Sequence, residues 1–234
     1  MSDADFDSAL IAAAFRLAAR DGWTRVSVVA ACREAGLPLT EARTRFPTRG
    51  HILVRFGQMA DQFALTDAPD EGPVRDRLFD LLMRRFDALN AQRDGIKALM
   101  RALPLDPPTA LLLNCATRTS MRWLLQAAGV PAAGLRGDLL VKGLVAVWLW
   151  GLRTWERDDT EDLTQTMAAV DQALGRAEWF ARLLTGGGRD TGAEETAASE
   201  AEDAGEGEEP DAVDGDGADD AAEESDAPYE PDPE

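Results

Sequence analysis

Arginine side chains gather in one short stretch near the N-terminus, where they could bind phosphate. Between Arg25 and Arg55 there are six arginines and only two acidic residues, a net charge of +4 before the chain's one histidine, His51, is counted. A guanidinium group can hold a phosphate oxygen or donate two hydrogen bonds to the edge of a guanine base. The alternative is a solvated helical face in an arginine-rich protein, and composition alone does not separate the two.

Other common kinds of chemistry have no matching motif in the sequence. His51 cannot form a histidine-rich metal site alone, and neither Cys32 nor Cys115 has a CxxC partner. The sequence contains no nucleophile elbow, dinucleotide-binding glycine pattern or phosphate-binding P-loop. We therefore expect no enzyme activity, no cofactor and no metal.

The formal net charge of −19 comes from the last 45 residues. Up to Arg189 the chain has 23 acidic and 24 basic residues, whereas residues 190–234 contain 20 acidic residues and no basic ones. With Tyr229 as its one aromatic residue, this segment cannot bury enough apolar surface to offset the entropy of ordering. We expect residues 186–234 to form a disordered acidic tail, which either improves solubility or competes with DNA for the arginines around Arg43.

The remaining residues are numerous enough for one or two small domains with a sizeable core. The two cysteines lie in apolar helical settings and indicate reduced thiols. Uncharged apolar runs are too short to span a bilayer, and the acidic N-terminus lacks the basic start of a secretory signal. We expect a cytoplasmic protein.

Apolar residues recur at helical spacing, and no stretch alternates convincingly with a period of two, so we predict an all-α fold. Gly22 and Gly36 are expected to end helices, Ser27 to cap one, and Pro38 to lie in the first turn of another. The predicted helices span residues 6–20, 28–35, 39–46, 49–64, 74–92, 96–103, 110–128, 135–157 and 160–184.

The first three predicted helices follow the helix-turn-helix pattern, in which the second of two short helices enters the major groove of DNA. We assign residues 1–48 to this DNA-binding domain and residues 49–185 to a helical domain for ligand binding and dimerisation.

Three motifs in this region follow one another at a specific spacing: GWTRVSV at residues 22–28, REAGL at 33–37 and FPTRGHIL at 46–53. They resemble, without gaps, the N-terminal domain of TetR-type transcriptional regulators. The resemblance implies a TetR-like homodimer that binds a palindromic operator in double-stranded DNA and responds to a small effector held by its second domain. We expect a ligand-responsive regulator that acts as a repressor.

The residues that we expect to contact DNA lie on or beside the third helix: Ser27, Leu39, Thr40, Arg43, Thr44, Arg45, Arg49 and His51. Leu39 stands where the family usually has a lysine. Arg43 and Arg45 replace two tyrosines, one of which typically contacts the DNA backbone in the family, and arginine can also hold phosphate.

A second resemblance concerns the later helices. WERDDTEDLTQT at residues 155–166, VRDRL at 74–78 and AAG at 127–129 are similar to the lipid-binding protein family of ubiquinone biosynthesis, which shares the TetR fold. This alternative implies a lipid-binding accessory protein without an operator. The same residues could also be purely structural, with Thr160 and Asp162 beginning a helix. The family's C-terminal membrane-binding helix corresponds here to glycine-rich and acidic sequence, so we expect no membrane contact.

Two further sets of residues complete the expectations. Apolar residues that could surround a small apolar or lipid-like effector, although such a stripe is more often core, are Met100, Leu112, Cys115, Met121, Trp123, Leu124, Val145 and Trp148. Residues expected to form a symmetric four-helix dimer interface are Val147, Trp150, Gly151, Trp155, Met167, Val170, Leu174 and Ala177.

Overall fold

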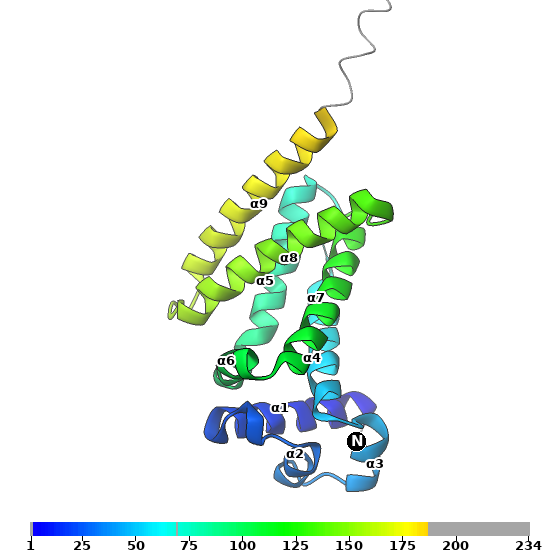
Figure 1. Cartoon of the computed structure of the whole chain (residues 1–234), viewed down its shortest axis with the longest axis vertical. Coiled ribbons are helices and arrows are strands. Elements are labelled where there is room, and N and C mark those ends of the chain that lie inside the picture. Colours follow the sequence, from blue (N-terminus) through cyan, green and yellow to red (C-terminus); the bar gives the residue numbers. More distant parts are fainter. Residues whose placement is uncertain (1, 69, 187–234) are drawn as a thin grey trace, which may run out of the picture. The chain divides into compact units, whose positions relative to one another are not determined.

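Helices make up most of the described chain, residues 2–68 and 70–186, in the computed structural model, and these residues contain no strand (Figure 1). The all-α prediction is confirmed. The disordered tail predicted for residues 186–234 lies, from residue 187 onward, outside the described residues. In chain order the elements are α1 (Asp3–Asp21), η1 (Trp23–Arg25), α2 (Val28–Glu34), α3 (Leu39–Arg45), α4 (Arg49–Leu65), α5 (Val74–Asn90), α6 (Arg93–Ala102), η2 (Leu103–Leu105), α7 (Pro107–Ala127), α8 (Gly134–Arg157) and α9 (Thr164–Gly186).

Local sequence sets the ends of the first three helices. Ser2 and Asp5 form a reciprocal capping box at the start of α1, and the Ser27 side chain accepts a hydrogen bond from Ala30 N at the start of α2, as predicted. Gly22 and Gly36 have φ values of +86° and +66°, in the region that favours glycine, and end α1 and the α2 turn respectively. The predicted helix-turn-helix elements are therefore present.

The longer helices α4, α5, α7, α8 and α9 form the second part of the molecule, and α4 leads into it from the end occupied by α1, α2 and α3 (Figure 1). The short helix α6 packs against α1 and η1. All these helices belong to one compact unit with a continuous core, so the domain boundary proposed at residue 48 falls at the α3–α4 junction inside that unit.

Packing of α8 against α9 and α5 corrects part of the predicted dimer interface. A Cβ at Gly151 would lie 2.8 Å from Val170 Cγ2 and 2.9 Å from Phe86 Cζ, which shows how closely these helices approach within one chain. Five of the residues assigned to the interface are buried in this core: Val147, Gly151, Trp155, Val170 and Leu174. Trp150 is exposed, and Met167 and Ala177 are partly exposed.

A buried carboxylate fixes the corner between α8 and α9. Asp158 accepts hydrogen bonds from the backbone N and hydroxyl of Thr160 and from the same two groups of Thr166, the last two at 2.8 Å. Burial by itself would raise the pKa of Asp158, but these hydrogen bonds outweigh burial and lower its pKa to about 2. The loop they hold delays the start of α9 to Thr164, four residues later than predicted from the sequence.

No helix in the described ranges combines the length and the apolar character needed to cross a membrane.

We predict that Asp158→Ala lowers the free energy of unfolding by about 2 kcal/mol at pH 7, because it leaves the buried backbone N–H and hydroxyl of Thr166 without an acceptor. Urea denaturation followed by circular dichroism measures this loss. Asp159→Ala is the matched control, since the Asp159 side chain is 91% exposed, and it should change stability by less than about 0.5 kcal/mol.

The same pair of proteins gives a pH test. The pKa of folded Asp158 is lower than its ordinary value of 3.8, so its carboxylate stabilises the fold above about pH 4 and that stabilisation is lost as the pH falls toward 2. The stability difference between the unchanged protein and Asp158→Ala should therefore shrink over this interval. A difference that stays constant from pH 5 to pH 2.5 contradicts the assignment.

Candidate nucleic-acid interface and adjoining cavity

One face of α3 points away from the core and carries four residues expected to contact DNA. Ala42 is buried in the core, so the opposite side of this seven-residue helix is the exposed one. It presents Leu39, Thr40, Arg43 and Thr44, which lie together because residues one turn apart share a helix face. Two hydroxyls, one guanidinium and one apolar side chain are thus available on this face.

Three exposed arginines in the N-terminal elements have no carboxylate partner among the described residues: Arg25 in η1, Arg33 in α2 and Arg43 in α3. Arg43 Nη1 donates one long hydrogen bond to Pro47 O at 3.5 Å, and without a carboxylate partner these guanidinium groups can hold phosphate oxygens. Arg25 and Arg33 were absent from the residues predicted to contact DNA. Both arginines were included in the local charge count between Arg25 and Arg55, which was the signal for them.

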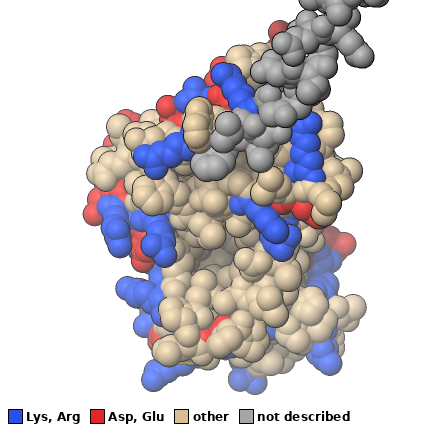
Figure 2. Space-filling model, turned by 45° about the horizontal axis from the view of Figure 1, so that its top comes forward, with Lys and Arg blue, Asp and Glu red and all other residues tan. Residues whose placement is uncertain are grey.

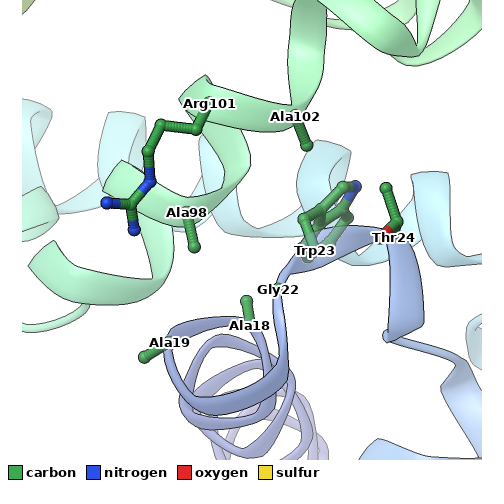
Figure 3. A pocket seen from close by; sticks show the side chains of 8 residues that line it. All are labelled: Ala18, Ala19, Gly22, Trp23, Thr24, Ala98, Arg101 and Ala102. Atoms are coloured by element: carbon green, nitrogen blue, oxygen red, sulfur yellow. The ribbon is translucent and has the colours of Figure 1, made fainter.

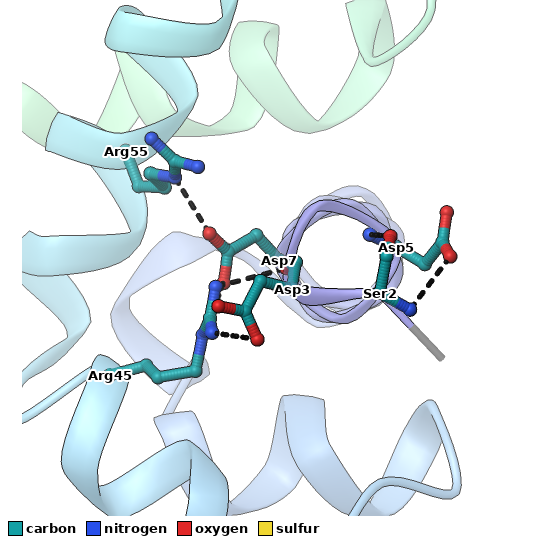
Figure 4. Close-up of polar contacts among 6 residues, drawn as sticks. All are labelled: Ser2, Asp3, Asp5, Asp7, Arg45 and Arg55. Atoms are coloured by element: carbon teal, nitrogen blue, oxygen red, sulfur yellow. Dashed lines mark hydrogen bonds and ion pairs between the residues drawn. The ribbon is translucent and has the colours of Figure 1, made fainter.

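Arg45 has a different environment from Arg43. Its Nε donates to Asp7 Oδ1 at 2.8 Å, and its Nη1 lies 2.8 Å from Asp3 Oδ1 (Figure 4). The other oxygen of Asp7 accepts from Arg55 Nε at 2.7 Å. The hydrogen bond to Asp7 also raises the pKa of Arg45 above its ordinary value. One carboxylate on α1 therefore holds both α3 and α4, and Arg45 is used inside the protein to position α3.

Arg49 and His51 lie at the start of α4. Arg49 Nη2 lies 2.6 Å from Asp106 Oδ2, just before α7, and its Nη1 donates to Thr24 O at 3.4 Å. His51 is exposed, with its Nδ1 3.0 Å from Thr48 Oγ1. Arg49 thus joins three segments of the chain. DNA contact by Arg45, Arg49 and His51, as by the exposed α3 residues and Ser27, stays a prediction.

The charged residues are unevenly distributed over the surface. On the face shown in Figure 2, Lys and Arg side chains predominate over Asp and Glu and lie mainly around a broad area of other residues.

A cavity of about 230 Å³ lies in the second part of the molecule, next to α1. Its lining is largely apolar and comes from α1, α4, α5, α6, η2, α7 and α8. Three residues expected to surround an effector line it, namely Met100, Val145 and Trp148. A mostly apolar cavity with a few polar groups is the usual form of a small-molecule site.

The other five residues expected at the effector site do not line this cavity. Cys115 is exposed and Trp123 is 60% exposed, whereas Met121 and Leu124 are fully buried in the core. Leu112 packs beside the start of α4. The helix α7 contacts α4, α5 and α8, so its apolar residues face several directions, and helical spacing alone could not identify those that face the cavity.

Arg85 and Asp61 form a buried ion pair at the cavity wall, which sequence reasoning missed. The Arg85 side chain is 7% exposed, and its guanidinium carbon lies 4.9 Å from the centre of the Trp148 ring. Asp61 Oδ2 accepts from Ser120 Oγ at 2.5 Å. A signal existed: residue 85 follows Leu78 and Leu82 on the apolar stripe of α5, so burial of an arginine could have been inferred.

A second, more open groove of about 310 Å³ lies between the end of α1, η1 and α6. Figure 3 shows small alanine side chains on both sides of it, with Arg101 at one edge and Trp23 at the other. The groove marks where α6 meets the helix-turn-helix segment. It offers little apolar enclosure, so the cavity beside Arg85 is the better candidate for a small molecule.

Solved structures share this fold at low sequence identity. A TetR transcriptional regulator from Nitrosomonas europaea matches with a TM-score of 0.60 and 22% identity, covering 75% of this chain and 99% of that chain. A TetR-family regulator from Streptomyces coelicolor matches with a TM-score of 0.55 and 19% identity over 79% and 85% of the two chains. A TetR regulator from Rhodococcus sp. RHA1 gives 0.52 and 16% over 75% and 97%. No protein-family model and no curated protein matches the chain.

These matches confirm that the described part of the chain has the TetR fold, as the motifs at residues 22–53 indicated. They give no support to the resemblance to the lipid-binding family.

We predict that Asp7→Asn lowers the free energy of unfolding by about 2–3 kcal/mol, because it leaves Arg45 and Arg55 facing a neutral group at a side chain that is 4% exposed. Urea denaturation measures the change. The matched control is Asp5→Asn, an exposed residue on the same helix, which should cost less than about 1 kcal/mol. Equal losses from the two variants would show that the Asp7 ion pairs do not hold α3.

Proposed function

We propose that this chain, on the premise of its TetR fold, is a DNA-binding transcriptional regulator that binds a palindromic operator as a homodimer and releases it when a small molecule occupies the cavity. The observation that carries the proposal is the exposed face of α3, where Thr40, Arg43 and Thr44 are accessible. On this proposal α3 is the recognition helix that lies in the major groove.

The different environments of Arg45 and Arg43 support this role. Arg45 is occupied by Asp3 and Asp7, so it fixes the position of α3, whereas Arg43 one turn away from the start of the helix has no carboxylate partner among the described residues. Arg25 in η1 and Arg33 in α2 are also exposed and have no carboxylate partner among the described residues. On this proposal, the exposed arginines contact phosphates, and α3, fixed in position by Arg45, reads the bases.

The dimer that a palindrome requires is proposed to use the outer face of α8. After the buried residues are excluded, this helix still exposes Leu139, Leu149 and Trp150, each by about half of its surface. Large apolar side chains exposed along one helix are typical of a protein–protein contact. A two-fold axis would bring the same face of two chains together and set the spacing of two copies of α3.

The proposed DNA binding is tested by selecting fragments from a genomic library with the full-length protein and then measuring affinity for the selected site. Arg43→Ala should weaken binding about 10- to 100-fold, because a good arginine contact to a base is worth about 1–3 kcal/mol. Its thermal stability should be unchanged, since Arg43 forms no ion pair among the described residues.

Arg136→Ala is the control for this experiment, because Arg136 is also exposed and lies in α8, away from the helix-turn-helix segment. It should bind DNA as the unchanged protein does. Selected fragments that share no palindrome, or equal affinity of the Arg43→Ala protein, would count against the proposal.

The proposed dimer makes a separate prediction. Trp150→Arg should convert the protein from dimer to monomer in sedimentation velocity, because a charge would replace an apolar side chain in the contact. Trp123→Arg changes another exposed tryptophan, on α7, and should leave the dimer intact. A Trp150→Arg protein that still sediments as a dimer would rule out this face of α8.

A further inference from the structure

The cavity beside Arg85 has one strongly polar feature in an apolar surrounding. Of the described residues that line it, Arg85 alone is charged, and Asn114 and Thr117 on α7 are the neutral polar ones. Most of the remaining wall is formed by leucine, phenylalanine, tryptophan and other apolar side chains. The cavity therefore fits a largely apolar molecule that has one polar group directed toward Arg85.

Arg85 has hydrogen-bonding capacity that the protein does not use. A guanidinium group has five N–H donors, and the ion pair with Asp61 engages its Nη1. Its Nη2 lies beside Gly57, which lines the cavity, at 4.0 Å from the place where a Cβ of that glycine would be, and it forms no hydrogen bond within the part of the chain that the structure describes. A buried donor without an acceptor is costly, so a ligand oxygen at this position would be favoured.

The charge of Arg85 is already balanced, which limits the kind of oxygen that fits. Asp61 supplies the counter-charge and is itself held by Ser120. A ligand carboxylate would add a second negative charge to this pair and leave a net charge in a site with little access to water, which is expensive. A neutral carbonyl oxygen accepts the same hydrogen bond and leaves the buried pair neutral.

The size of the cavity sets a second limit. Its volume of about 230 Å³ is below the usual range of about 300–1,000 Å³ for small-molecule sites. The ring of Trp148 and the side chain of Phe56 form part of the wall, and flat rings pack well against such surfaces. A compact molecule therefore fits better than a long isoprenoid chain.

We propose that the cavity binds a compact, uncharged, largely apolar molecule that carries a carbonyl oxygen, and that Arg85 donates a hydrogen bond to that oxygen. The role of this molecule as the effector rests on the proposed function, whereas its binding to the protein does not. Arg85 acts here as the specificity-determining residue, and the apolar walls bind the rest of the molecule.

The test uses three probes of similar size with the full-length protein in the absence of DNA: methyl benzoate, benzoate and ethylbenzene. Ligand-observed NMR titration measures their dissociation constants. Methyl benzoate should bind about 10-fold more tightly than ethylbenzene, because it satisfies a buried donor that ethylbenzene leaves unpaired. Benzoate should bind more weakly than methyl benzoate. Tighter binding of benzoate, equal binding of the ester and ethylbenzene, or no binding of any probe would each overturn the proposal.

The decisive variant removes both charges together, Asp61→Leu with Arg85→Met, because replacing a whole buried ion pair by apolar residues keeps a protein folded where removal of one partner does not. In this double variant the ester should lose its advantage over ethylbenzene, with dissociation constants within about 2-fold. The control removes a different ion pair between helices, Arg122→Ala with Asp138→Ala, which lies outside the cavity lining. It should retain the 10-fold preference, and loss of the preference in the control would also overturn the assignment.

These experiments can contradict the proposed function and the proposed ligand class independently of each other. A protein that selects no DNA but binds methyl benzoate through Arg85 keeps the binding site and loses the regulatory role. A protein that binds a palindrome but shows no preference for the ester keeps the regulatory role and loses this ligand class.

Discussion

The arrangement of the N-terminal helices depends on one buried carboxylate. Asp7 on α1 pairs with Arg45 at the end of α3 and with Arg55 in α4. A helix of seven residues such as α3 is too short to be stable alone, so its orientation comes from tertiary contacts. Ala42 and Phe46 bury its inner side, and Asp7 fixes its end to the helix that enters the rest of the molecule. Because Asp7 binds both arginines, α3 cannot shift relative to α4 without breaking an ion pair.

Charged pairs join other helices in the same way. Arg49 links the start of α4 to Asp106 at the start of α7, and Asp61 on α4 pairs with Arg85 on α5. The main helical contacts are apolar and not directional, whereas each of these pairs fixes the relative position of two particular turns. Along α4, Arg55 thus connects to α1, Arg49 to the start of α7 and Asp61 to α5.

The sequence was sufficient to predict the fold, but it was insufficient to predict which face of a helix is buried. Helical spacing and glycine positions predicted most helices to within a few residues, and the TetR motifs identified the fold. On α8, however, apolar residues occupy both the inner and the outer face, so Trp155 and Val147 were assigned to the dimer contact with Trp150 although they are buried in the chain. Periodicity gives the angle between residues on a helix, and only the packed neighbours decide which side faces inward.

Charged residues on an apolar stripe were the missed signal. Asp7 lies between Phe6 and Leu10 on α1, and Arg85 lies next to Phe86 on α5. Such residues are buried only when a partner of opposite charge meets them, and the partners come from distant parts of the sequence. Their presence predicts that a pair exists, but the fold is needed to name it.

The cavity and α3 are physically connected through α4 and α1. Phe56 lines the cavity, and its ring centre lies 4.8 Å from that of Phe15 on α1, whose ring is in turn 6.0 Å from that of Trp23 in η1. The neighbour of Phe56 is Arg55, which pairs with Asp7. A molecule that enters a cavity of about 230 Å³ and displaces Phe56 therefore acts on the helix turn that holds α3. A packed interior transmits such a displacement because it has few voids to absorb it. Under the proposed function, a ligand would change the spacing of two α3 helices in a dimer without touching α3, because α4 carries both the cavity wall and Arg55, which shares Asp7 with Arg45 of α3.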